Sequence, residues 1–343
     1  MFDGEKCLAN CLHALHHSEL APIECIVVND GSSDRSAAIA TELGCAVLST
    51  GLRRGPAYAR NLGARAAAGD ILVFLDADVC LHADSLELLR RHFESDPQLA
   101  AAFGSYDSSP QHVAFVSQFR NLLHCFTHQT GDPDARTFWS ACGAIRREWF
   151  ERVGGFRTDC ARPATEDIDL GYRIKAQGGE IHLDPAILVT HQKSWSLLSM
   201  VQTDIFDRAA PWTRLILQSG TCPNDLTLRR RRMASAVLTC LAFCFLMLAL
   251  AGLNRGASTA LAAAALAASA LLDLDFYRFL KSVRGFRFSV AAVPLYSLFH
   301  LCSGVGSVLG TALFLCALFR RTRETVASTD INVKDPGDLR AHL

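Results

Sequence analysis

The stretch ILVFLDADVC runs from Ile71 to Cys80. It opens with an apolar run of the kind found in strands that are buried on both faces, and Asp76 and Asp78 follow directly. Two carboxylates this close repel each other and lose hydration when they are buried. A cation nearby would offset both effects, so the stretch predicts a cation site at the end of a buried strand.

Strands and helices alternate around this stretch, which is typical of an α/β domain with a mostly parallel sheet. In such sheets ligands bind beyond the C-terminal ends of the strands. Asp30 and the Asp76/Asp78 pair both follow predicted strands, so we expect them to face one cleft. Besides the strand that starts at Ile71, the pattern predicts strands over Ile23–Asp30 and Cys45–Thr50 and helices over Ser33–Gly44 and Gly55–Gly69.

The C-terminal part of the chain is far more apolar than the rest. Met233–Leu253 carries no charge and follows the cluster Arg229–Arg232, and at about 1.5 Å per residue it is long enough to cross a bilayer. Ala257–Leu272 and Val290–Phe319 are two further apolar runs. We therefore expect two or three membrane helices, with the arginine cluster on the cytoplasmic side. The pattern leaves open whether the last run crosses the membrane or is re-entrant.

Composition narrows the class of protein. Among 343 residues, 34 lysines and arginines balance 34 aspartates and glutamates, so no global charge attracts nucleic acid. The 13 cysteines contain no CxxC pair, and Met1–Asn10 is too polar for a secretory signal. These features indicate reduced cysteines in a cytosolic or membrane-embedded chain.

Acidic residues also stand at a predicted helix start. ATEDIDLGYRIKAQGG, from Ala164 to Gly179, predicts a helix with Thr165 near its N-cap and with Glu166 and Asp167 in its first turn. The helix dipole favours ionised carboxylates there. Ordinary helix-end electrostatics explains this pattern, and an ionised general base at a cleft mouth explains it equally. The strand-end aspartates allow a solvated turn or a site for Mg²⁺ or Mn²⁺.

Five short motifs occur in series: NDGS, RGPAYARN, DAD, CGAIRREWFERVGGF and TEDIDL. In these motifs and their spacing, roughly Ile23 to Trp195 resembles glycosyltransferase family 2, the inverting sugar transferases with a GT-A fold. The apolar C-terminal region is similar to the tails of membrane-anchored bacterial members. The resemblance implies a GT-A domain, with a Rossmann-like, mostly parallel sheet, followed by an α-helical transmembrane region.

The resemblance implies binding roles for the first three motifs. Asp30 would hold the nucleobase of a UDP- or GDP-sugar, and Arg60 would lie near the nucleotide. Asp78, helped by Asp76, would bind the Mg²⁺ or Mn²⁺ that bridges the diphosphate. The metal would neutralise the charge of the departing nucleoside diphosphate.

The remaining motifs would serve the acceptor side. Asp167, beside Glu166, would take the proton from the acceptor hydroxyl, which then attacks the anomeric carbon with inversion. Gly143 would shape the donor-sugar and acceptor pocket. Trp195 would lie under the acceptor sugar or lipid, and His191 would be a further metal ligand.

Two features depart from the family pattern. Relatives usually begin with an apolar strand, whereas Met1–Leu15 predicts the helix that should follow that strand, so we expect the first strand to be missing, with a start downstream of the true one. Processive polysaccharide synthases carry QxxRW, and HQKSW, from His191 to Trp195, lacks its spacing and its arginine. This difference argues against a processive polymerase.

The leading hypothesis is a multi-pass enzyme of the inner (plasma) membrane with a cytoplasmic catalytic domain. It would transfer a sugar from a nucleoside diphosphate to a hydroxyl or phosphate of a membrane lipid or glycolipid. A catalytically impaired scaffold of the same fold and a sugar-phosphate nucleotidyltransferase are the alternatives. The expected parts are a nucleotide-sugar-binding half at 1–105, an acceptor-binding and catalytic half at 106–195, interfacial helices at 196–232, a transmembrane region at 233–319 and a polar tail at 320–343.

Overall fold

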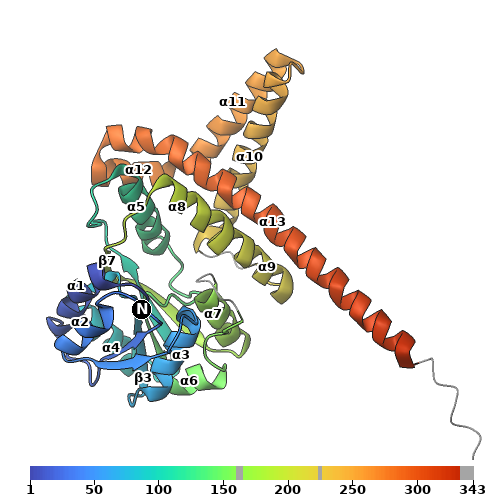
Figure 1. Cartoon of the computed structure of the whole chain (residues 1–343). Coiled ribbons are helices and arrows are strands. Elements are labelled where there is room, and N and C mark those ends of the chain that lie inside the picture. The colour runs from blue at the N-terminus through green and yellow to red at the C-terminus, as the bar shows by residue number, and fades with distance from the viewer. Residues whose placement is uncertain (160–164, 223–225, 333–343) are drawn as a thin grey trace, which may run out of the picture.

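The computed structural model describes residues 1–159, 165–222 and 226–332, which form an α/β domain and a helical region (Figure 1). All the strands and helices predicted around Ile71 are present with shorter bounds, and the chain begins with the predicted helix. The helices of this domain are α1 Glu5–His16, α2 Ser36–Glu42, α3 Pro56–Ala66, α4 Ser85–Ser95, α5 Phe115–Gln129, α6 Arg147–Arg152 and α7 Glu166–Ala176. Its strands are β1 Ile26–Asn29, β2 Ala46–Ser49, β3 Ile71–Leu75, β4 Val79–Leu81, β5 Leu99–Tyr106, β6 Cys142–Arg146 and β7 Glu180–His191.

The strands form two sheets. β1 and β2 pair in parallel, and a five-stranded sheet has the order β3-β6-β5-β7-β4. Within the described residues of that larger sheet, only β5 and β7 are parallel neighbours, so the expectation of a mostly parallel sheet is wrong there. The physical reason lies in the connections: β6 enters between β3 and β5 in the opposite direction, and the short turn from β3 to β4 leaves no room for a crossover helix.

β5 forms the middle of the domain, because all eight of its residues are buried. One apolar cluster packs it against α1 and α4 and includes Leu12 and Leu89, and a second cluster packs it against α3, α6 and α7 and includes Phe138 and Ile174. The sheet therefore lies between two helical layers, and the turn after β3 reaches one edge of this core.

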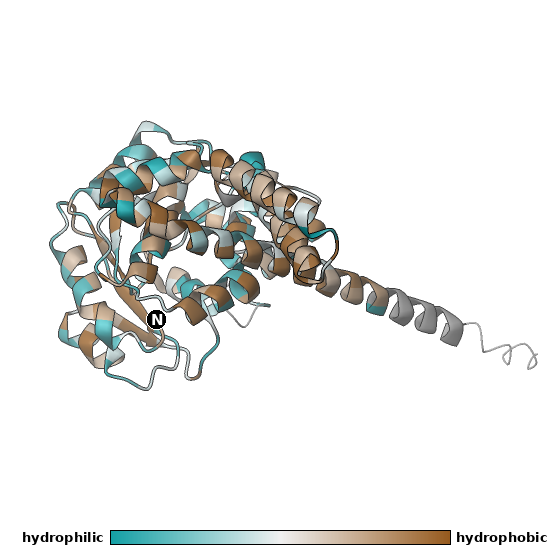
Figure 2. Cartoon of the chain, turned by 90° about the horizontal axis from the view of Figure 1, so that it is seen from above, coloured by the Kyte–Doolittle hydropathy of each residue, from teal (hydrophilic) through white to brown (hydrophobic). Residues whose placement is uncertain are grey.

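The helical region follows β7 and contains α8 Leu197–Gln202, the π-helix η1 Thr203–Ala209, α9 Ala210–Ser219, η2 Leu226–Leu228, α10 Arg230–Leu250, α11 Arg255–Leu272, α12 Leu274–Arg284 and α13 Phe286–Asn332. Three of its segments are long and apolar enough to cross a membrane, as predicted: α10, α11 and Phe286–Arg320 of α13. Hydrophobic residues run along these helices (Figure 2). The predicted polar tail begins inside α13, and its last part, 333–343, lies outside the described residues.

Helix α5 joins the two regions, because it is buried from both sides. Phe119, Leu122 and Phe126 pack against Phe276 of α12 and Tyr296 of α13. The helices of Figure 1 are thus fixed to the α/β domain through one shared apolar cluster.

Small residues let α13 approach η1 and α9 closely. A β-carbon at Gly306 would collide with Ala209, and one at Gly310 would collide with the Ala210 carbonyl oxygen. Such spacing of two glycines on one helix face is a common device for close packing of membrane helices.

A buried polar cluster connects α10, α11 and α13. The Ser235 hydroxyl lies 2.7 Å from the Ser269 hydroxyl and also donates to the Asp273 carboxylate. His300 Nε2 lies 2.9 Å from the same carboxylate, and Thr239 lies 2.9 Å from Ser269. Polar side chains inside a membrane bundle are stabilised by each other, so this cluster should fix how the three helices pack.

We predict that Asp273→Ala destabilises the helical region by about 1–3 kcal/mol, because Ser235 and His300 would lose a buried acceptor. Thermal unfolding in detergent measures the effect. Asp275→Ala is the matched control, since its ion pair with Arg231 is about half exposed and should contribute little. Equal melting temperatures for the two variants would contradict this role of Asp273.

Candidate active site

Arg60 connects three separate elements at the C-terminal end of β3. From α3, its Nη2 lies 2.7 Å from Asp76 Oδ1 and its Nη1 lies 2.9 Å from Glu166 Oε1 at the start of α7. Burial alone would lower the pKa of Arg60, but Asp76 and Glu166 outweigh it and raise that pKa. The sequence placed these residues in three different motifs, and the structure brings them together.

The two strand-end aspartates occupy a turn between β3 and β4. Asp76 contacts Arg60, while Asp78 Oδ2 lies 3.6 Å from His191 Nε2 at the end of β7. Burial would raise the pKa of Asp78, but His191 and Lys193 hold it below its usual value. Both aspartate side chains remain about one-third exposed, so their other oxygens are open to a ligand.

His191 is held from two further sides. Its Nδ1 lies 2.7 Å from Asn121 Oδ1 of α5, and its ring stacks on Tyr106 at 4.3 Å between centroids. These contacts fix the ring so that Nε2 faces Asp78. A role for His191 as a metal ligand stays a prediction.

Asp30 is buried at the end of β1, where it organises the loop after β2. Its carboxylate accepts hydrogen bonds from the Thr50 hydroxyl at 3.0 Å and from the backbone amides of Arg54 at 2.9 Å and Gly55 at 2.8 Å. Gly55 has φ +92°, a conformation that favours glycine, and α3 starts at the next residue. Asp30 thereby positions the helix that carries Arg60, and its contact with a nucleobase stays a prediction.

Asp167 lies in the first turn of α7, directly after Glu166. Its Oδ1 accepts from the Ile168 amide at 2.8 Å, and its Oδ2 lies 3.3 Å from the Ser140 hydroxyl. Burial and the neighbouring Glu166 raise the pKa of Asp167 to about 6, although Arg60 acts in the opposite direction. Such a carboxylate is ionised at neutral pH and basic enough to accept a proton.

Two further predicted site residues, Gly143 and Trp195, are packed against other parts of the α/β domain. Gly143 lies within β6, paired with Phe74 and Phe103, and a β-carbon there would collide with the Trp139 carbonyl oxygen. Trp195 is buried beside α5, where its Nε1 lies 3.3 Å from Asn121 Oδ1. Their contacts with substrate stay predictions.

A buried charged cluster beneath the site was not predicted. Arg120 of α5 lies 2.5 Å from Asp204 of η1, and both side chains are almost fully buried. Arg208, one π-helical turn later, contacts the His124 ring at 3.1 Å. Burial and Arg120 lower the pKa of Arg208 to about 10, although Asp204 and Asp167 act in the opposite direction. The sequence signal was the shared helical face of Asp204, Arg208 and Trp212.

The residues around the β3–β4 turn suit a hard divalent cation. Within the described ranges, no three side chains of histidine, cysteine, aspartate or glutamate gather as a complete metal site. Mg²⁺ and Mn²⁺ sites that also bind phosphates commonly use one or two carboxylates and take the remaining ligands from substrate and water. Asp78, which is ionised, and Asp76, whose side chain is about one-third exposed, fit that pattern.

Comparisons with known proteins bear on the fold and on the reaction class of relatives. Residues 1–154 match the sequence model described as glycosyl transferase family 2. The first part of the chain is therefore similar to the domain of family 2 glycosyltransferases. A solved mannosyltransferase from Pyrobaculum calidifontis, in complex with GDP-Man and Mn²⁺, has a TM-score of 0.57 at 18% identity over 90% of this chain and 85% of its own. This likeness confirms the GT-A fold followed by apolar helices.

Curated relatives match about half of this chain. The pre-mycofactocin glycosyltransferase of Mycobacterium tuberculosis is 28% identical over 203 residues, which are 55% of this chain and 42% of that protein. The glucosyl-dolichyl phosphate glucuronosyltransferase of Haloferax volcanii is 25% identical over 46% of this chain and 55% of its own. The chain spans about half the length of the curated relatives it matches.

We predict that Arg60→Met destabilises the α/β domain by about 3 kcal/mol, because the buried Glu166 loses its ion pair with a cation. Denaturant unfolding followed by tryptophan fluorescence measures the change. Arg65→Met, at an exposed position of the same helix, is the control and should behave like the unmodified protein. An Arg60 variant as stable as the Arg65 variant would show that the bridge does not hold α7 in place.

Proposed function

We propose that the chain is a membrane-bound inverting glycosyltransferase. It moves a sugar from a nucleoside diphosphate to a hydroxyl or phosphate of a membrane lipid or glycolipid. The observation that carries this proposal is the Arg60 bridge, because it brings the strand-end Asp76 and the first turn of α7 to one point. The family 2 match of residues 1–154 supports the reaction class.

The donor would bind at the C-terminal end of β3. Asp30 and the loop it organises lie on the nucleobase side, and Asp76 and Asp78 would hold Mg²⁺ or Mn²⁺, with His191 beside them. When bound, the metal neutralises the negative charge of the leaving diphosphate. The Mn²⁺ and GDP-Man of the related mannosyltransferase support this assignment.

Asp167 would be the general base. Its carboxylate takes the proton of the acceptor hydroxyl while that oxygen forms a bond with the anomeric carbon. The bond from this carbon to the diphosphate oxygen breaks, and the electron pair leaves with the nucleoside diphosphate. Attack opposite the leaving group inverts the anomeric configuration. Ser140 and Ile168 orient the carboxylate for this step.

The helical region supports an acceptor at the membrane surface. The π-helix η1 and α9 lie between the catalytic domain and α13, and Arg208 carries a buried positive charge close to Asp167. A cation there would attract a phosphate-bearing acceptor. The dolichyl phosphate in the name of the archaeal relative supports this class. With Arg229–Arg232 on the cytoplasmic side, the catalytic domain would face the cytoplasm of an inner-membrane enzyme.

The pH dependence tests Asp167. Because its ionised form is active and its pKa is about 6, kcat/KM should rise with pH through about 6 and level off above it. Asp167→Asn should lower transfer about 10²–10⁴-fold and remove this limb, while donor binding changes little. If Asp167→Asn kept most of its turnover, another residue would be the base.

Donor binding tests the metal site. Titrating UDP and GDP into the full chain with Mn²⁺ should give metal-dependent binding that Asp78→Ala weakens about tenfold or more. Asp84→Ala, at an exposed aspartate in the N-cap position of α4, is the matched control. Free nucleoside diphosphate as the product identifies sugar transfer, whereas pyrophosphate would indicate nucleotidyl transfer. Metal-independent binding in the unmodified chain would remove Asp78 from this role.

A further inference from the structure

The connection from β5 to α5 exposes apolar side chains at its tip. All five residues at 111–115 are exposed, and Val113 among them is 91% exposed. Phe115, the first residue of α5, is also exposed. Side chains in these positions contribute little to the core of the α/β domain. We call residues 107–114 the β5–α5 loop.

Hydrogen bonds fasten the β5–α5 loop to the turn between α12 and α13. Arg284, the last residue of α12, donates through Nη2 to the Ser108 carbonyl at 2.9 Å and through Nε to Gln118 Oε1 at 2.8 Å. Gln118 Nε2 in turn donates to the carbonyl groups of Pro110 at 3.1 Å and His112 at 2.6 Å. The helical region therefore determines where the tip of the loop lies.

The loop lies beside the start of an apolar helix. The Phe115 ring packs edge-on against Phe288 of α13, with 4.9 Å between the ring centroids. Phe288 belongs to Phe286–Arg320, a segment long and apolar enough to cross a membrane. Val113 precedes Phe115 by two residues, a reach of at most about 7 Å. A bilayer around the start of this segment would thus extend to the tip of the loop.

The distribution of charge indicates where the bilayer would end. No aspartate, glutamate, lysine or arginine occurs between Arg287 and Arg320. At about 1.5 Å per residue these two arginines are about 50 Å apart along a continuous helix, and a bilayer with its headgroups is about 40–45 Å thick. When this segment crosses the membrane, Arg287 and the neighbouring Lys281 and Arg284 lie at the level of the phospholipid headgroups. Cations at that level are attracted by anionic lipids.

Two exposed leucines extend the apolar surface. Leu197 and Leu198 are exposed at the start of α8. They follow Trp195, whose backbone amide donates to the Ser117 hydroxyl in the first turn of α5 at 2.8 Å. Figure 1 shows α8 and α12 close to α5. We call the exposed apolar residues around the start of α5 the loop patch, which consists of Val113, Phe115, Leu197, Leu198 and Phe286.

We propose that the loop patch is a lipid-contact surface, through which the β5–α5 loop inserts Val113 and Phe115 into the headgroup–acyl boundary of the cytoplasmic leaflet. This inference rests on the proposed membrane-bound enzyme. Single exposed apolar side chains are ordinary, but a patch that adjoins an apolar helix and is flanked by cations matches a bilayer surface. A second copy of this chain is a poorer match, because Lys281, Arg284 and Arg287 of the two copies would approach each other in a symmetric contact.

The lipid contact would set the height of the proposed donor site above the bilayer. β5 ends at Tyr106, whose ring stacks on His191 beside Asp78. The backbone amide of Gln111, within the loop, donates to the His191 carbonyl at 3.4 Å. A loop held in the headgroup layer therefore holds the turn after β3 at a fixed distance from that layer.

Tryptophan quenching in lipid nanodiscs tests the lipid contact. The full chain is placed in nanodiscs of phosphatidylcholine and phosphatidylglycerol, with or without bromine on the acyl chains near the headgroups, and the emission of the unmodified chain is subtracted. With Val113→Trp, brominated lipid should lower the added emission about twofold or more, because the new indole lies about 5–10 Å into the leaflet.

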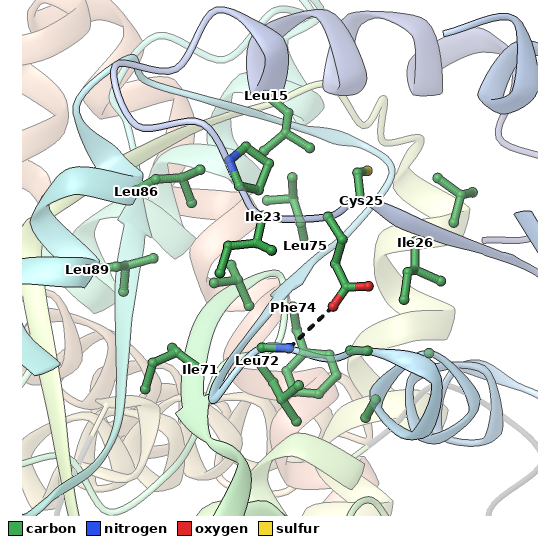
Figure 3. Close-up of a pocket in the computed structure, with 18 of the residues that line it drawn as sticks. Leu15, Ile23, Cys25, Ile26, Ile71, Leu72, Phe74, Leu75, Leu86 and Leu89 are labelled. Carbon is green, nitrogen blue, oxygen red and sulfur yellow. Dashed lines mark hydrogen bonds between the residues drawn. The ribbon is translucent and has the colours of Figure 1, made fainter. Parts of the chain in front are cut away.

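Two control variants accompany this measurement. Ile23→Trp is the matched control, because Ile23 is likewise 91% exposed. Ile23 lies at an apolar cavity of about 790 Å³ that β1 and β3 line (Figure 3), and Figure 1 shows β3 at the end of the α/β domain away from α12. Its added emission should be the same in both lipids. Leu241→Trp, at an exposed position of α10, should be quenched strongly.

The pattern of quenching separates the possible failures. Quenching of Leu241→Trp without quenching of Val113→Trp would overturn the lipid contact and leave the membrane-bound enzyme intact. A blue-shifted emission of Val113→Trp without quenching would overturn it in favour of a second copy on the loop patch. No quenching at Val113 or Leu241 would overturn the membrane assignment together with the lipid contact. If Val113→Trp fails to fold, His112→Trp at the adjacent exposed position takes its place.

Discussion

The two ion pairs of Arg60 are the constraint on which the site depends. Asp76 follows a strand and Glu166 begins a helix, and these two carboxylates would repel each other without a cation between them. The guanidinium satisfies both with separate nitrogens and so fixes the distance between the strand end and α7. Asp167 is positioned together with Glu166, because the two residues are neighbours in the first turn of α7. Asp30 positions the start of the helix that carries Arg60. The Arg60 side chain thus holds together a site whose residues come from four sequence motifs.

The helical region shares this rigidity because α5 belongs to both parts of the molecule. One of its faces packs in the apolar cluster with α12 and α13, and Arg120 pairs with Asp204 of η1. Asn121 of the same helix orients His191 beside Asp78. The apolar helices and the proposed metal site are therefore connected through a single turn of α5. The α/β domain would therefore keep a fixed orientation relative to the apolar helices and to the proposed acceptor at the bilayer.

Local patterns predicted local structure well. Apolar runs, glycine stops and helix-start residues gave the elements from β1 to β3, the first helix and the apolar helices, since those signals lie within a few residues. The insertion of β6 between β3 and β5 could not be predicted, because strand order depends on contacts between residues 67 to 75 positions apart. The same holds for the two partners of Arg60 and for the pair Arg120–Asp204. In the sequence, Arg120 is an ordinary polar position of an amphipathic helix. Only the fold shows that the π-helix η1 covers it.

The buried cluster around Asp273 and His300 has a consequence for biogenesis. Its members come from α10, the end of α11 and α13, so the first hairpin leaves the ribosome with an acidic side chain whose imidazole partner has not yet been made. In the proposed membrane enzyme, the nascent hairpin must keep that carboxylate near the headgroups until the last helix arrives. Translation beyond His300 would then be the step that commits the three helices to their final packing.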